Sequence, residues 1–200
     1  MTASVTAELR TPRLLLRTPA LTDAFALAAY LARNADHFAA TDPPRRAGYD
    51  TAVVQAEQIA LALEQQAAGR RVSWLLCPTH APAEVIGRIN LTEIVRGPFH
   101  NAYLGYQIDR AHQGRGLMHE ALDAATAHAF AVIGLHRIEA NHLPDNARSA
   151  ALLARLGFER IGIARNYLFI AGAWRDHVLN QKLNPDFDVG VFVGDATDRR

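Results

Sequence analysis

A turn with two glycines is the first place in this chain where chemistry is expected. Gln113-Gly114-Arg115-Gly116 stands between an apolar segment that ends at Ile108 and a helical pattern that starts at Leu117. Free N–H groups at a helix start, with the helix dipole behind them, bind phosphate or pyrophosphate, and glycines let the anion approach. A dinucleotide fingerprint needs a third glycine where His119 stands, and the Gly-Lys-Ser/Thr of a P-loop is absent. The turn therefore predicts an anion site of another kind.

Further polar residues follow on the next two elements. Glu139 and Asn141 alternate with apolar residues, so on a strand they share one face, while His142 lies on the other. Asn146 is a candidate cap for a short helix whose first turn contains Ser149. A salt-bridged strand glutamate and an ordinary capping serine remain alternative interpretations of these residues.

The elements that position these groups follow a mixed α/β order. Thr22 is expected to cap the first helix, and 34–49 reads as loop. Periodicity and turn residues predict, in order, strand 13–17, helix 22–33, helix 50–69, strands 72–77, 84–93 and 101–108, helix 117–134, strand 137–143, helix 146–156 and a hairpin of 159–168 with 174–183. The strands on either side of helix 117–134 should be parallel.

Composition and charge limit the possible functions. The chain has 200 residues, 50% of them hydrophobic, which favours one domain over 1–187 and a tail over 188–200, where Val189–Val193 could add an edge strand. A net charge of +1 provides no general field for nucleic acid or a membrane. The start lacks a signal-peptide pattern, and no window is apolar enough to span a membrane, so we expect a cytoplasmic protein.

Two other reactive side chains are assigned no role. Cys77 lies in an apolar run and is expected to be a buried structural thiol. His119-Glu120 opens like a zinc-protease helix, but Asp123 stands where the second histidine would be, so we expect no metal site.

The order of these features resembles the GNAT acyl-CoA N-acyltransferase superfamily. The family turn reads Gln/Arg-x-x-Gly-x-Gly/Ala, and this chain has Ala111 at the first position, which loses a side-chain contact but keeps the amide cradle. Between Thr11 and Phe187 the chain is similar to the RimJ/RimL branch of that family. The segments that carry this similarity are Val95–His100, Tyr103–Tyr106, Gln113–Met118, Leu152–Phe158 and Trp174–Leu179.

The resemblance implies a fold and a co-substrate. The expected fold is a GNAT sheet of seven mostly antiparallel strands and about four helices, in which the parallel strands splay apart and admit the pantetheine arm of acetyl-CoA. The N–H near Ile108 would polarise the thioester carbonyl. The implied contacts to acetyl-CoA are Tyr106, Gln107, Ile108, Gln113, Gly114, Arg115, Gly116, Leu117, Met118, Asn141, Asn146 and Ser149.

The resemblance also suggests how the amine would react. Glu139 would be a base acting through water; Asn141 stands where some relatives have a glutamate and would orient that water. Many members protonate the leaving thiolate with a tyrosine where this chain has Leu153, which leaves Ser149 to stabilise the sulfur. His37, Phe38 and Tyr167 are candidates for the acceptor pocket.

The implied acceptor is the N-terminal α-amine of a ribosomal protein, with alanine as its first residue, and the enzyme would be a monomer or homodimer. An α-amino group costs about 1 to 1.4 kcal/mol to deprotonate at pH 7, whereas a lysine costs roughly 4.6 kcal/mol, so a weak base suits a protein N-terminus. Two alternatives stay open: acetylation of a small-molecule amine, and a non-catalytic module that binds acyl-CoA.

Overall fold

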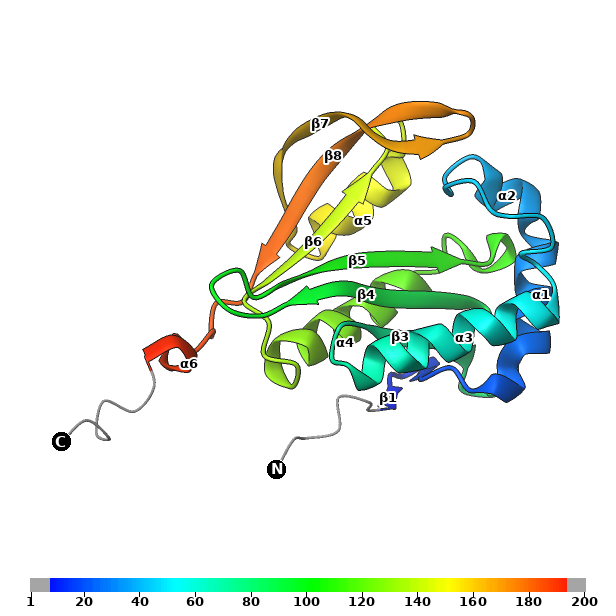
Figure 1. The fold of residues 1–200 in the computed structure, drawn as a ribbon, viewed down its shortest axis with the longest axis horizontal. Coiled ribbons are helices and arrows are strands. Elements are labelled where there is room, and N and C mark those ends of the chain that lie inside the picture. The colour runs from blue at the N-terminus through cyan, green and yellow to red at the C-terminus, as the bar shows by residue number, and fades with distance from the viewer. Residues whose placement is uncertain (1–7, 194–200) are drawn as a thin grey trace.

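One mixed sheet is the centre of the fold. Within residues 8–193, the part that the computed structural model describes, eight strands pair in the order β1-β2-β3-β4-β5-β6-β8-β7 (Figure 1). The strands are β1 (Leu9–Arg10), β2 (Leu14–Arg17), β3 (Val72–Pro78), β4 (Gly87–Val95), β5 (Asn101–Ile108), β6 (Arg137–His142), β7 (Glu159–Ile170) and β8 (Ala173–Leu183). The helices are η1 (Leu21–Asp23), α1 (Ala24–Arg33), α2 (Ala35–Ala39), α3 (Ala52–Ala67), η2 (Arg110–His112), α4 (Leu117–Ala131), α5 (Ala147–Arg155) and α6 (Gly190–Val193).

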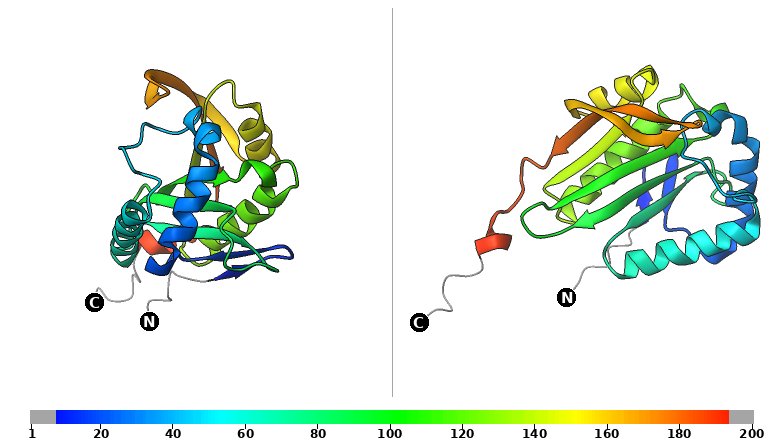
Figure 2. Two further views of the ribbon diagram at one scale, coloured as in Figure 1. Left: turned by 90° about the vertical axis from the view of Figure 1, so that its right-hand side faces the viewer. Right: turned by 45° about the horizontal axis from the view of Figure 1, so that its top comes forward.

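Side-chain alternation gives the sheet two apolar faces. Trp74 and Leu76 of β3 belong to a cluster with α4 and α5, whereas Leu75 and Cys77 belong to a cluster with α1, α2 and α3. Figure 2 shows these two groups of helices on opposite sides of the sheet. Burial raises the pKa of the Cys77 thiol, in keeping with its expected structural role.

The unit β5-α4-β6 is the parallel crossover that the sequence predicted, since β5 and β6 pair in parallel and the other neighbouring strands are antiparallel. Apolar residues at helical spacing hold α4 on the sheet, among them Leu117, Ala121 and Leu122. The mixed α/β class and the mostly antiparallel sheet with one parallel pair are confirmed, with one two-residue strand, β1, beyond the predicted seven.

The start of the first helix was predicted wrongly. Thr22 does not cap it, because residues 21–23 form the 3₁₀ helix η1, and α1 begins at Ala24. The Asp23 carboxylate accepts hydrogen bonds from the Arg17 guanidinium at 2.7 Å and from the Ala20 N–H at 2.8 Å. These contacts replace the expected cap and join β2 to the helix start.

The segment 34–49 was predicted as loop but contains the helix α2. Phe38 explains the difference, because its buried ring packs on Tyr30 of α1 with the ring centroids 5.5 Å apart. The following helix begins at Ala52 with Thr51 as its cap, two residues after the predicted start at residue 50. A short helix fixed by one buried ring leaves almost no periodic signal in the sequence.

The C-terminal segment also differs from its prediction. Residues 190–193 form the short helix α6, so the proposed edge strand at Val189–Val193 is wrong. The rings of Phe187 and Phe192 lie within 5.2 Å of the His100 ring, which anchors the segment beside the start of β5. The rest of the predicted tail, and residues 1–7 of the predicted domain, lie outside the described residues.

Candidate active site

The two parallel strands, β5 and β6, diverge after a short stretch of pairing, which we call the seam. Their register contains three pairs, which are Asn101 with Arg137, Ala102 with Ile138, and Tyr103 with Glu139. Beyond that seam β5 stays with β4 as far as Ile108, while β6 stays with β8 as far as His142. The predicted splay is therefore present, and Figure 1 shows the two strands diverging.

The splay leaves one edge of β5 unpaired. The Asp109 N–H donates to the Ile86 carbonyl at 2.8 Å, so residues of that parity face β4. In an antiparallel ladder the alternate residues point their N–H and C=O groups the other way, which for Tyr106 and Ile108 is into the split. An extended chain with amide groups, such as pantetheine, could pair with this edge as an added strand.

The glycine turn lies at the wide end of the split. Gly114 and Gly116 have φ of 72° and 75°, a left-handed conformation that side chains rarely adopt, and Gly116 is the N-cap of α4. A Cβ at Gly114 would meet nothing within 4 Å, so the space in front of the turn is open. The backbone here fits the predicted anion cradle.

Side chains from three helices brace this turn. The Gln113 amide donates to the His37 ring of α2 at 2.6 Å and accepts from Arg148 of α5 at 2.7 Å. Arg33 of α1 donates to Asp109 at 2.5 Å. His37, predicted for the acceptor pocket, thus contacts the turn, and the Gln113 side chain is occupied by protein partners.

Asp109 lies between β5 and the glycine turn, where it caps the short helix η2. Burial would raise its pKa, but hydrogen bonds from the Arg33 guanidinium and the Ala111 N–H outweigh burial and lower the pKa below its ordinary value. The Asp109 carboxylate thus ties the exit of β5 to α1 and to the Ala111 N–H.

A hydroxyl pair spans the split on the α5 side. The Tyr106 and Ser149 oxygens are 2.6 Å apart, and Asn146 caps α5 by accepting the Ser149 N–H at 3.1 Å. Burial raises the pKa of Tyr106, so its phenol stays protonated. Leu153, where many relatives have a tyrosine, is buried in the core. Tyr106 was expected only as a contact to acetyl-CoA. Side chains alternate between the two faces along β5, and this alternation places Tyr106 with Leu104 and Ile108 on the face that α5 covers.

The polar residues of β6 lie on the opposite face, because Ile138 and Ala140 point into the α4 cluster. Glu139 is buried at the end of the seam, with the Arg137 guanidinium 3.0 Å away and an Asn101 amide donor at 3.4 Å. Two residues further along β6, the Asn141 side-chain amide donates to the Tyr167 hydroxyl at 3.4 Å. Its buried Oδ1 has no hydrogen-bond partner within residues 8–193, so it can accept from a ligand or water.

A cavity of about 390 Å³ opens on the same side as α2. Its walls include Phe38 and Asp42 from α2 and the loop after it, and Gly172 from the tip of the β7–β8 hairpin. Asp42 accepts a hydrogen bond from the side-chain amide of Gln107. The oxygen of the same amide accepts from the Arg88 guanidinium at 2.7 Å. This polar chain joins the cavity to β5. Phe38 lines the cavity, whereas His37 and Tyr167 lie outside it.

The chain matches a known protein family over the elements that form this candidate site. A family profile described as "Acetyltransferase (GNAT) domain" matches residues 13–159. The chain belongs to the GNAT acetyltransferase family. The matched range includes the seam, the glycine turn and the Tyr106–Ser149 pair.

Individual relatives agree with the family. The [Ribosomal protein uS5]-alanine N-acetyltransferase of Escherichia coli is 52% identical over 107 residues, which are 54% of this chain and 55% of that protein. The chain thus matches about half the length of this curated relative. A Ribosomal-protein-S5-alanine Acetyltransferase from Vibrio fischeri shares the fold with a TM-score of 0.87 and 31% identity, over 91% of this chain and 99% of that one. Mycobacterium smegmatis RimJ in complex with CoA-disulfide gives 0.82 and 26%, over 89% and 86% of the two chains.

Across the described part of the chain, no three His, Cys, Asp or Glu side chains gather closely enough to hold a metal ion. Glu120, the second residue of the zinc-like sequence, is bound instead to Thr11 and Arg13. None of the helices between residues 8 and 193 is long and apolar enough to cross a bilayer.

Proposed function

We propose that this chain transfers an acetyl group from acetyl-CoA to the N-terminal α-amine of a protein, with the alanine of a ribosomal protein as acceptor. The observation that carries the proposal is the unpaired edge of β5 leading directly to the glycine turn. One end suits an extended pantetheine, and the other suits a pyrophosphate. The relatives named for acetylation of the ribosomal S5 alanine support the choice of acceptor.

The donor would be held mainly by backbone. Tyr106 and Ile108 would offer N–H and C=O groups to pantetheine, and the free amides at the start of α4 would bind the pyrophosphate. Leu117 and Met118 have buried side chains, so only their N–H groups are available. The Ile108 N–H would polarise the thioester carbonyl as the amine attacks.

The proposed chemistry moves two protons in opposite directions. The amine nitrogen attacks the carbonyl carbon and loses a proton through water to Glu139, with Asn141 orienting that water. The C–S bond then breaks, and the thiolate receives a hydrogen bond from Ser149. Tyr106, 2.6 Å behind Ser149, supplies the proton that Ser149 passes to the sulfur. A phenol is a far better proton source than an alcohol, so in this proposal Tyr106 takes the part of the family tyrosine that Leu153 replaces.

Peptide acetylation followed by mass spectrometry tests this function. Peptides that begin with alanine or serine should be acetylated at the α-amine, and an N-terminally blocked peptide with a free lysine should not. The sequence at residues 2 and 3 should then be varied, because the cavity at Phe38 is large enough for side chains beyond the first. Acetylation restricted to the lysine side chain would refute the proposal.

A small-molecule acceptor is the second candidate, and the same cavity favours it. Its volume of about 390 Å³ lies in the range of small-ligand sites, and Asp50 in its wall carries a negative charge, whereas Asp42 is already paired with Arg45. Free alanine, spermidine and an aminoglycoside, assayed beside the alanine peptide, separate the two. A catalytic efficiency for one of these amines above that for the peptide would favour the second candidate; binding of CoA without any product would indicate a non-catalytic module.

A further inference from the structure

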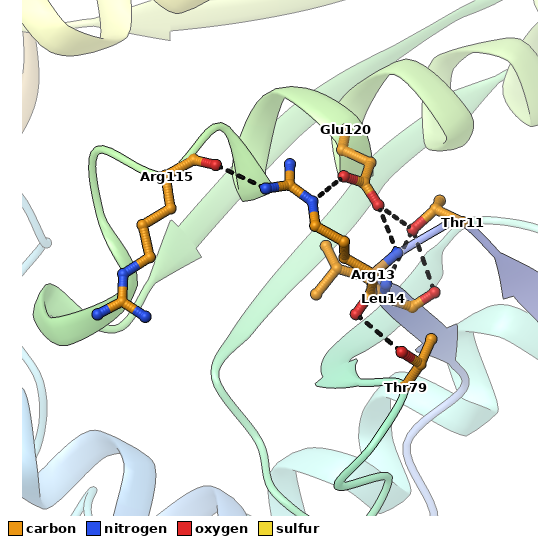
Figure 3. Close-up of polar contacts among 6 residues, drawn as sticks. All are labelled: Thr11, Arg13, Leu14, Thr79, Arg115 and Glu120. Carbon is orange, nitrogen blue, oxygen red and sulfur yellow. Dashed lines mark hydrogen bonds and ion pairs between the residues drawn. The ribbon is translucent and has the colours of Figure 1, made fainter.

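An arginine from the edge of the sheet contacts the backbone of the glycine turn. Arg13 lies immediately before β2, 102 residues away from the turn in sequence, yet its Nη1 donates to the Arg115 carbonyl at 2.9 Å. Its Nε donates to Glu120 of α4 at 2.6 Å (Figure 3). One guanidinium therefore bridges the turn and the first part of the helix that follows it.

The carboxylate that holds Arg13 is itself fixed by several donors. Glu120 accepts the Arg13 backbone N–H at 2.9 Å and the Thr11 hydroxyl at 2.6 Å (Figure 3). Burial would raise the pKa of Glu120, but these hydrogen bonds outweigh burial and lower it. Glu120 also lies in the first turn of α4, where the helix dipole favours a negative charge. The Arg13 side chain is thus held at one end by a rigid anion.

The other end controls the direction of one peptide group. In a trans peptide the C=O and the following N–H point in opposite directions, so an Arg115 carbonyl turned toward Arg13 directs the Gly116 N–H away from it. Gly116 has a φ of 75° and hardly resists rotation of that peptide. Arg13 Nη2 also lies 3.5 Å from the position of a Cβ on Gly116, directly beside the turn.

We propose that Arg13 is a positioning residue for the donor. Together with Glu120 it holds the Arg115–Gly116 peptide, so that the Gly116 N–H already points toward the pyrophosphate site before acetyl-CoA binds. The Arg115 side chain extends away from Arg13, so the contact is to its backbone alone (Figure 3). This inference rests on the proposed use of acetyl-CoA. It assigns Arg13 a role in donor affinity and none in the chemical step.

The test measures the affinity for CoA by titration calorimetry in the wild type, Arg13→Met, Arg13→Lys and Glu120→Gln. Methionine keeps the aliphatic stem; lysine keeps the charge but cannot span both Glu120 and the Arg115 carbonyl. The exposed Arg160→Met on β7 is the matched control for a lost positive charge. We expect the Kd of CoA to rise about tenfold in Arg13→Met and at least threefold in the other two, because a preorganised hydrogen bond to a charged group is lost, and to stay unchanged in the control.

A second donor separates positioning from general damage to the fold. S-acetylpantetheine lacks the pyrophosphate, so kcat/KM for it should be the same in wild type and Arg13→Met, while kcat/KM for acetyl-CoA falls about tenfold with kcat preserved. Equal losses with both donors would overturn the inference, as would an unchanged Kd of CoA in Arg13→Met. Retained affinity in Arg13→Lys would also overturn it, since charge alone would then suffice.

The same measurements keep this inference apart from the proposed function. Weaker CoA binding in Arg13→Met by an otherwise inactive protein would refute the acetyl transfer and support the positioning role. A wild type that does not bind CoA would refute both. Melting temperatures within a few degrees of the wild type in the Arg13→Lys and Glu120→Gln proteins would show that the comparison concerns folded molecules.

Discussion

Replacing Ser149 by alanine tests the proposed route of the proton to sulfur. Ser149 Oγ is 2.6 Å from the Tyr106 hydroxyl, and it faces the split where the thiolate would form. A hydrogen bond to a charged group contributes about 1.5 to 3 kcal/mol. If this bond to the thiolate exists only in the transition state and product, its loss should lower kcat about tenfold to a hundredfold.

The assay follows release of free CoA thiol with a colorimetric disulfide reagent, at saturating acceptor peptide. We expect Ser149→Ala to lower kcat while the KM for acetyl-CoA changes less than about twofold, because the Asn146 cap accepts the backbone N–H and does not need the hydroxyl. Tyr106→Phe keeps the ring and removes the proton source, so it should lower kcat several-fold. The double variant should be little worse than Ser149→Ala, since the two hydroxyls act in series.

The pH dependence sharpens this test. The pKa of Tyr106 is raised by burial above its ordinary value of 10.0, so the phenol remains neutral throughout the range of the assay. The ratio of wild-type to Tyr106→Phe kcat should therefore be constant between pH 7 and 9. An unchanged kcat in Ser149→Ala, or strictly multiplicative effects in the double variant, would refute the relay and leave Ser149 as part of the helix cap.

Three further predictions concern the other parts of the site. Glu139→Gln should lower kcat at least tenfold at pH 7 and much less at pH 9, where the α-amine is already neutral; a defect independent of pH would remove Glu139 as the base. Gly116→Ala should cost about 1 to 2 kcal/mol in unfolding free energy and weaken CoA binding, because its φ of 75° strains any residue with a Cβ; a denaturant titration and calorimetry measure both, and wild-type values would contradict the left-handed turn. The depressed pKa values of Asp109 and Glu120 contribute stability that is complete above their unfolded values near pH 4 and is lost as the pH falls further, so Glu120→Gln should flatten the loss of stability between pH 5 and 3.

The sequence could predict what is set by local rules. Asn146 as a cap, the strand ending at Ile108 and the glycine turn follow from residues close together in the chain, and the structure has each of them. The splayed pair came from the family resemblance, because nothing in the residues of β5 and β6 states that they pair only three times. The left-handed φ at Gly114 and Gly116 is the physical reason for both glycines.

Contacts between distant segments were beyond prediction from the sequence. Tyr106 and Ser149 are 43 residues apart, and Arg13 and Arg115 are 102 apart, so neither pair leaves a spacing to read. Thr22 is not a cap because Arg17 and the Ala20 N–H donate hydrogen bonds to the Asp23 carboxylate, and the residues around Thr22 form the 3₁₀ helix η1. The helix α2 was missed because the burial of Phe38 against Tyr30 depends on tertiary packing.

The short seam between β5 and β6 leaves sheet hydrogen bonds unmade within the core of the fold. Extending the pairing past Tyr103 and Glu139 would add hydrogen bonds and tighten the sheet, but each added pair would consume an N–H or C=O that the donor is proposed to use. Substitutions that lengthen this pairing should therefore raise thermal resistance and remove activity together. Added CoA should raise the melting temperature in a dose-dependent manner, because it would supply from solution the strand that the chain itself leaves out.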